Sequence, residues 1–231
     1  MSFFDSENED YWIPLADIMT GLALVFILIA TSYIVKINQE KKQIIVKYNQ
    51  SNIRTVHNLD IKKNIYNQLV NEFKNDLPKW QANIESKNLV FSFNNEAVLF
   101  DTGKANIKPA FKDILQDFFP RYLKALTTNV YNNEISEIRI NGFASKVWNN
   151  KSDSNIAFFK NMELSWQRAF IVLNYVYYQL PSSKNQESYL REHFTANGFS
   201  SSNSILDANG IENSSQSQRV EFEVLLRDDK I

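Results

Sequence analysis

The sequence contains no cysteine and only two histidines, His57 and His193, among its 231 residues. The chain therefore has no disulfide bond, no thiolate metal site and no cysteine nucleophile. Two histidines are too few for a histidine-built metal site or a Ser-His-Asp triad. No Walker A loop, Gly-x-Gly-x-x-Gly, Gly-x-Ser-x-Gly or His-Glu-x-x-His motif is present either. We expect a protein that is not an enzyme and that carries no cofactor.

Charge is nearly balanced, with 25 basic and 26 acidic residues and a net charge of −1, so nothing in the overall charge predicts direct nucleic acid binding. The first ten residues carry acids and neither lysine nor arginine. A secretory signal needs a basic start and a small-residue cleavage site. The apolar segment that follows is therefore expected to remain as an anchor.

One long apolar run occupies residues 13–35 and contains a single charge, Asp17. As a helix it would be about 34 Å long at about 1.5 Å per residue, enough for a hydrocarbon core of about 30 Å. A carboxylate at such a depth costs about 2.5–3.5 kcal/mol and usually marks an ion pathway or a partner contact. The sequence predicts a transmembrane helix in which Asp17 carries an ion. The alternative is that Asp17 lies at the membrane interface and only anchors the helix.

Four-residue spacing places Thr20 on the same helix face as Asp17, together with Gly21 and Thr31. A stripe of small and slightly polar residues suits contact with a partner helix. Thr20 offers a hydroxyl oxygen to a sodium ion, although threonines in helices also bond their own backbone.

Residues 36–87 are polar and contain no glycine, and their apolar residues recur every fourth position. This spacing predicts a helical connector with a narrow apolar seam. The seam either pairs with a second copy of the chain or packs on the domain that follows. Its members are Ile61, Ile65, Leu69, Phe73 and Leu77, continued by Trp80 and Ile84.

The remainder alternates strand-like and helix-like patterns and predicts an α+β fold, with two helices on one face of a small sheet. Strands are expected at 89–93, 97–100, 137–142, 193–197 and 220–225, and helices at 107–122 and 163–180. A polar loop is expected to run to about Lys160. The second helix is expected to bury Trp166, Ala169, Phe170, Leu173, Val176, Tyr177 and Leu180.

Asn161, Ser165 and Arg168 form the opposite stripe of that helix and are expected to point outward together. An arginine offers a rigid, bidentate fork for a carboxylate. The stripe is therefore a candidate ligand site, the alternative being a solvated helix face with Asn161 as a cap.

Residues 12–20, Trp-Ile-Pro-Leu-Ala-Asp-Ile-Met-Thr, resemble the membrane motif of MotB-type stator subunits, and most closely that of Zorya anti-phage defence stators. The resemblance implies that Asp17 binds the coupling ion, H⁺ or Na⁺. It also implies a homodimer inside a pentameric ring of a multi-span MotA-like or ZorA-like subunit, in the inner membrane.

A second resemblance, over residues 88–231, is to the OmpA-like peptidoglycan-binding domain with its βαβαβ order. It is carried by residues 99–109, 138–145 and 217–222, and by Asn-x-x-Leu-Ser-x-x-Arg-Ala at 161–169. The family usually has an aspartate where Ser145 stands, so peptidoglycan binding is expected to be weaker or to use another group. The resemblance implies that the ligand is peptidoglycan and that Ser145, Asn161, Ser165, Arg168 and Arg219 bind it.

The expected organisation is a cytoplasmic tail (1–12), a transmembrane helix (13–35), a helical linker for dimerisation that can carry a plug (36–87), and a periplasmic OmpA-like domain (88–231). Lysines at 36, 41, 42 and 47 follow the span, and the positive-inside rule alone would place that side in the cytoplasm. We adopt the orientation that the family implies. The alternatives are a flagellar MotB-type stator subunit, a Tol- or Exb-type energy transducer, and a purely structural protein anchored in the membrane and bound to the wall.

Overall fold

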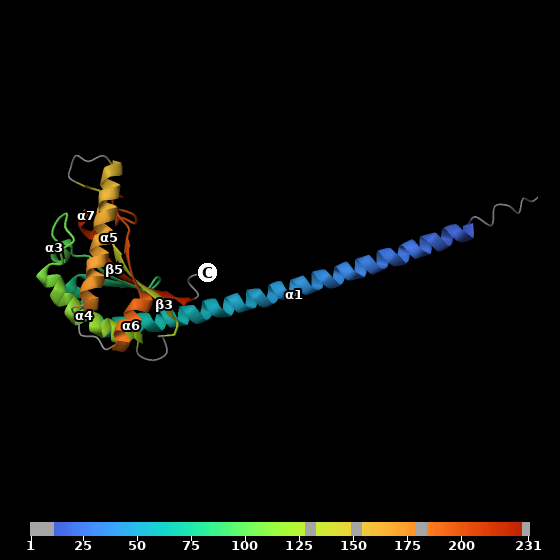
Figure 1. Ribbon diagram of the computed structural model, residues 1–231, viewed down its shortest axis with the longest axis horizontal. Coiled ribbons are helices and arrows are strands. Elements are labelled where there is room, and N and C mark those ends of the chain that lie inside the picture. The colour runs from blue at the N-terminus through green and yellow to red at the C-terminus, as the bar shows by residue number, and fades with distance from the viewer. Residues whose placement is uncertain (1–11, 128–132, 149–153, 179–183, 228–231) are drawn as a thin grey trace, which may run out of the picture. The chain divides into compact units, whose positions relative to one another are not determined.

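The computed structural model describes residues 12–127, 133–148, 154–178 and 184–227 (Figure 1). It contains two compact units, Met1–Thr55 and Val56–Ile231. Helices and a sheet occur together in the chain, so the predicted α+β class is confirmed.

The first unit contains the greater part of helix α1, Trp12–Phe73. Within the described residues, α1 is the one helix long and apolar enough to cross a membrane. Its regularity follows from composition, because Gly21 is the only glycine in it and Pro14 stands in its first turn, where a missing N–H does no harm.

The last turns of α1 belong to the second unit and supply part of its core. Ile61, Ile65, Leu69 and Phe73 are all buried there. Of the two uses expected for this seam, packing on the following domain is therefore the one that the structure shows. Helix α2 (Leu77–Trp80) follows, with Pro78 in its first turn.

The predicted helical stripe does not continue to Ile84. Gln81 adopts a left-handed conformation (φ 49°) directly after α2, and the chain then enters strand β1, Ala82–Glu85. Ile84 pairs with Phe91 across an antiparallel ladder. That part of the prediction was wrong because a single apolar residue at this spacing, Ile84, fits a helix and a strand equally well.

The sheet has the order β1-β2-β5-β3-β4 (Figure 1). Its other strands are β2 (Val90–Phe93), β3 (Ile135–Gly142), β4 (Phe194–Gly198) and β5 (Val220–Leu226), all close to predicted positions. β3 and β4 are parallel, and the remaining pairs are antiparallel. The strand predicted at 97–100 is wrong, since residues Glu96–Leu99 form the short helix α3.

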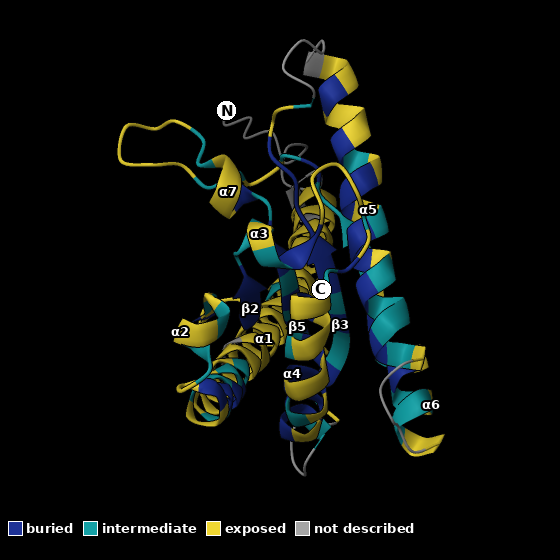
Figure 2. Cartoon of the chain, turned by 90° about the vertical axis from the view of Figure 1, so that its left-hand side faces the viewer, coloured by how far each residue is buried: buried dark blue, intermediate teal, exposed yellow. Residues whose placement is uncertain are grey.

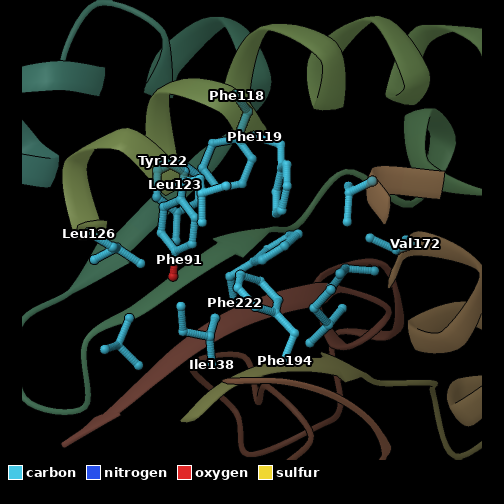
Figure 3. Close-up of a cluster of buried hydrophobic side chains, with 14 of the residues drawn as sticks. Phe91, Phe118, Phe119, Tyr122, Leu123, Leu126, Ile138, Val172, Phe194 and Phe222 are labelled. Atoms are coloured by element: carbon cyan, nitrogen blue, oxygen red, sulfur yellow. The ribbon is translucent and has the colours of Figure 1, made fainter. Parts of the chain in front are cut away.

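Aromatic side chains fill the space between the sheet and helix α4 (Pro109–Thr127), as Figure 3 shows. The ring centroid of Phe118 lies 4.6 Å from that of Phe91 and 5.1 Å from that of Phe222. Helices α5 (Ser154–Tyr178), α6 (Lys184–His193) and α7 (Ser214–Ser217) complete the unit. Because α5 begins at Ser154, the loop predicted to reach Lys160 is shorter than expected.

Helix α5 is rotated relative to the prediction, although Ala169 and Val176 are buried as predicted. Asn161, Ser165 and Arg168 are buried, with exposed fractions of 2%, 0% and 2%, whereas Trp166 and Phe170 are 48% and 47% exposed. The core face of α5 is formed by Ala169, Val172 and Val176, and Leu180 lies outside the described residues.

Two paired glycines explain this rotation. Gly142 ends β3 and lies opposite Gly198 of β4. A Cβ atom on Gly142 would be 2.1 Å from the carbonyl oxygen of Ser165, and one on Gly198 would be 2.6 Å from the backbone nitrogen of Trp166. The backbone of α5 thus lies directly on the sheet at these two positions.

Candidate ligand-binding hollow

A hollow of about 660 Å³ lies where β3 ends, bounded by the loop before α4, the first half of α5, and α7. Among the described residues that line it, none is charged. They are Thr102, Gly103, Ser145, Val147, Trp148, Asn161, Leu164, Ser214 and Gln218. The wall combines hydroxyl and amide groups with one indole ring, a composition suited to a polar organic ligand.

Asn161 fixes the segment that follows β3. Its Nδ2 atom donates to the carbonyl oxygens of Ser145 at 2.8 Å and Val147 at 3.4 Å. Asn161 is therefore a lining residue whose amide nitrogen is already used, and it positions Ser145. Ser145 itself is 7% exposed and lines the same hollow.

Ser165 holds the loop after β4 rather than lining the hollow. Its Oγ atom accepts from the backbone nitrogen of Ser200 at 2.9 Å and donates to the carbonyl oxygen of Met162 at 2.9 Å. The Ser200 hydroxyl in turn donates to the carbonyl oxygen of Phe158 at 2.7 Å. These bonds attach the start of the 200–213 loop to α5.

Arg168 does not line the hollow but contacts Gln218, which does. Its Nε atom donates to the carbonyl oxygen of Lys104 at 3.0 Å, and its Nη1 atom lies 3.5 Å from Oε1 of Gln218. The guanidinium also lies over the Phe100 ring, 4.9 Å from its centroid. Gln218 lines the hollow and so stands between Arg168 and any ligand.

The charge of Arg168 is poorly compensated. Within the described part of the chain, no carboxylate forms an ion pair with it. Burial lowers the pKa of the Arg168 guanidinium to about 10, and the more distant Glu96 carboxylate opposes that shift only in part. A buried cation in contact with neutral acceptors attracts an anion placed nearby.

Arg219, the residue after Gln218, makes its contacts outside the hollow. Its Nε atom lies 2.6 Å from Oε1 of Glu221, and its guanidinium stacks 3.8 Å from the centroid of the Phe143 ring. Phe143 stacks in turn on Phe199 at 5.0 Å. Burial raises the pKa of the Glu221 carboxyl, while Arg219 acts in the opposite direction. Arg219 does not line the hollow; it packs the turn that leads into β5.

Asp17 and Thr20 lie in the first unit, one turn apart on α1. The Asp17 side chain is exposed. The Thr20 hydroxyl donates to the carbonyl oxygen of Ala16 at 2.7 Å, which is the backbone bond that the sequence left open as an alternative. Its oxygen keeps lone pairs for an ion. The ion-binding role of this pair stays a prediction.

Sequence reasoning missed seven of the nine described lining residues: Thr102, Gly103, Val147, Trp148, Leu164, Ser214 and Gln218. Thr102, Gly103, Leu164 and Gln218 fall inside three of the four segments that carry the second resemblance, so their position was the available signal. Val147, Trp148 and Ser214 lie outside those segments, and nothing in the sequence pointed to them.

Comparisons with known proteins place the chain. No protein-family model matches it. It is 39% identical over 224 residues to the Zorya protein ZorB of Escherichia coli, across 96% of this chain and 89% of the relative. Among solved structures, a MotB-like protein from Desulfovibrio vulgaris aligns with 22% identity and a TM-score of 0.47, covering 72% of this chain and 91% of its own. The cell wall anchor of the T6SS from Pseudomonas aeruginosa aligns with 18% identity and a TM-score of 0.45, over 69% and 97%. From the identity to the E. coli protein over nearly the whole of both chains, this protein belongs to the ZorB family of Zorya proteins.

Proposed function

We propose that the chain is the MotB-like stator subunit of an ion-driven motor in the inner membrane that acts in anti-phage defence. The observation that carries this proposal is Asp17, the single charge in an apolar span of a chain that belongs to the ZorB family. The N-terminus is cytoplasmic, the second unit is periplasmic, and two copies lie within a pentameric ring of the MotA or ZorA type.

Asp17 binds and releases the coupling ion at the contact with the ring. Protonation or sodium binding neutralises the carboxylate and weakens its polar contacts, which allows the ring to move by one step. Release of the ion on the other side restores the charge and the contacts. A carboxylate without a nearby basic residue in residues 13–35 is suited to this cycle, because no permanent ion pair holds it.

The test is phage protection in cells that carry Asp17→Asn, with the membrane level of the protein measured in parallel. Asp60→Asn is the matched control, because it makes the same change on an exposed position of the same helix outside the span. We expect Asp17→Asn to abolish protection at normal abundance and Asp60→Asn to retain it. If both variants protect as well as the wild type, the chain is a structural wall tether.

The hollow of the second unit is the proposed peptidoglycan site. A stem-peptide carboxylate placed beside Gln218 would meet the field of Arg168, whose charge no described carboxylate pairs with. The lowered pKa of Arg168 corresponds to a burial penalty on the order of 3 kcal/mol, and an anion in the hollow offsets part of it. Ser145, Asn161 and Thr102 supply the remaining hydrogen-bonding groups of the wall.

Gln218→Glu tests this assignment without removing a buried group. The new carboxylate would pair with Arg168 and repel the carboxylate of a ligand, so binding should fall while the domain stays as stable as before or becomes more so. Gln216→Glu adds the same charge on an exposed position of α7 outside the hollow. The measurement is co-sedimentation of the full chain in detergent with purified sacculi. Equal binding by both variants would remove the hollow from consideration.

A further inference from the structure

The outward face of α5 carries a regular apolar pattern that the fold leaves uncovered. Seven positions follow one another at alternating steps of three and four residues, and six of them are apolar. We call this set the α5 seam: Ile156, Phe159, Glu163, Trp166, Phe170, Leu173 and Tyr177. Figure 2 shows exposed residues along this helix, opposite its buried side.

Exposure is greatest over the first four turns. Ile156 is 56% exposed, Phe159 69%, Trp166 48% and Phe170 47%. The rings of Trp166 and Phe170 stack on each other with centroids 5.5 Å apart and planes at 20°, so they form one flat surface. Leu173 and Tyr177 are half-buried and extend the seam toward the helix end. Apolar surface of this kind is unfavourable in water unless a partner covers it.

The spacing defines the shape of the partner. Apolar residues at alternating steps of three and four form the seam of a coiled coil, in which each side chain inserts between residues of a facing helix. The core of the unit does not need this face, because α5 already buries the opposite one through Ala169, Val172 and Val176. The occupant of the seam is therefore another helix.

We infer that the α5 seam pairs with the α5 seam of a second copy of this chain, and that the two helices run antiparallel. In a parallel pair, Glu163 would face Glu163 of the second copy, and two like charges would oppose each other. In an antiparallel pair the two Glu163 residues lie about 15 Å apart, at about 1.5 Å per residue over ten residues. Trp166 then faces Phe170 of the second copy.

The antiparallel register fits along the rest of the seam. With Trp166 opposite Phe170 of the second copy, Glu163 falls opposite Leu173 and Phe159 opposite Tyr177. Each contact occurs twice, as a two-fold axis requires. No like charges meet within these pairs, and each aromatic residue of the seam meets another aromatic residue.

The exposed area points to a second copy that is already held nearby. Taking about 150–250 Å² per aromatic side chain, the exposed fractions of Phe159, Trp166 and Phe170 give about 350 Å² per copy. Two copies bury about 700 Å², below the roughly 1,200 Å² of a stable free complex. Two chains anchored in one membrane assembly meet at an effective concentration in the millimolar range, where such a contact forms. This inference rests on the dimer of the proposed function.

Cysteine crosslinking tests the pairing, because the chain has no cysteine of its own. Four single variants of the full chain are made in membranes and treated with a short bismaleimide. Phe170→Cys reports the seam, Phe159→Cys distinguishes parallel from antiparallel pairing while it leaves Glu163 in place, and Ile34→Cys at the end of the span reports the dimer itself. Ile211→Cys is the matched control, since Ile211 is an apolar loop residue that is 64% exposed and lies outside the seam.

We expect Phe170→Cys to give crosslinked dimer at roughly ten times the yield of Ile211→Cys or more, because the pairing holds the two Phe170 positions about 6 Å apart along the helix axis and leaves Ile211 outside the contact. Phe159→Cys should stay at the Ile211→Cys level, because in the antiparallel register the two Phe159 positions lie about 27 Å apart, at about 1.5 Å per residue over eighteen residues. If Phe170→Cys stays at that level while Ile34→Cys crosslinks, the dimer exists and the seam pairing is refuted. If Ile34→Cys also fails, the dimeric stator is refuted and the seam pairing with it. Strong crosslinking of Phe159→Cys refutes the antiparallel arrangement, and a crosslink of Phe170→Cys to a different protein refutes the second copy as occupant.

Discussion

Gly142→Ala is expected to destabilise the second unit more than alanine at Gly103 or Gly210, where an added Cβ atom meets nothing within 4 Å. The added Cβ atom would lie 2.1 Å from the carbonyl oxygen of Ser165 and 3.4 Å from the backbone nitrogen of Ala169. Both atoms belong to the backbone of α5, so no side chain can turn aside. The helix must move away from the sheet by about 1 Å to restore a normal contact.

That movement disturbs two sets of contacts. The packing of α5 on the sheet is strained, which costs about 1–3 kcal/mol for overpacking. The bond from the backbone nitrogen of Ser200 to Oγ of Ser165 is stretched, at about 1 kcal/mol. The sum is about 2–4 kcal/mol, which lowers the melting temperature of a domain of this size by about 4–16 °C.

Thermal unfolding of the full chain in detergent, followed by tryptophan fluorescence, measures this effect because Trp148 and Trp166 lie in the second unit. Gly21→Ala is the control, since a Cβ on Gly21 meets nothing within 4 Å and alanine is the better helix former. We expect the control to melt as the wild type does. A Gly142→Ala variant that melts within about 2 °C of the wild type would refute the close contact between α5 and β3.

Two further changes probe charged contacts of the same unit. Arg121→Met should lower the stability of this unit by about 1–3 kcal/mol, because Arg121 lies 2.7 Å from Glu72, 3.0 Å from Asp76 and 4.7 Å from the centroid of the Phe73 ring. In the same denaturant titration, Arg191→Met at an exposed position of α6 should have little effect. Glu221→Gln should change the pH dependence of stability. Burial raises the pKa of Glu221 above its ordinary value of 4.5, so its contribution is fully present below pH 4.5 and is lost as pH rises through the higher folded value. The urea midpoint of Glu221→Gln minus that of the wild type should therefore increase when the pH is raised from about 4.5 to about 7. If this difference is the same at both pH values, the burial of the Glu221 carboxyl is contradicted.

Composition and alternation were enough to predict part of the fold. The helix through residues 13–35 follows from one charge in a long apolar run, and β5 follows from strict alternation over 220–225. The run at 97–100 was assigned to a strand because four apolar residues do not distinguish a strand from one helical turn. Only its surroundings, with Glu96 at the start of a turn, decide for α3.

The orientation of α5 was not accessible in the same way. Hydrophobicity alone places Trp166 and Phe170 inside and Arg168 outside, yet the structure does the reverse. The deciding features are the paired glycines of β3 and β4, and the backbone carbonyls of Ser145 and Lys104 that receive the polar side chains. These partners are distant in sequence, so the motif at 161–169 did not indicate that its polar side chains are buried.

The end of α1 has a mechanical consequence. Separating that end from the second unit would expose Ile61, Ile65, Leu69 and Phe73, at about 1.5–3 kcal/mol for each buried side chain. The sum of about 6–12 kcal/mol is comparable to the whole free energy of unfolding of an ordinary domain. A pull along α1 therefore cannot detach the helix from a domain that stays folded. The contact between the end of α1 and the second unit is therefore expected to be lost only when the unit itself unfolds.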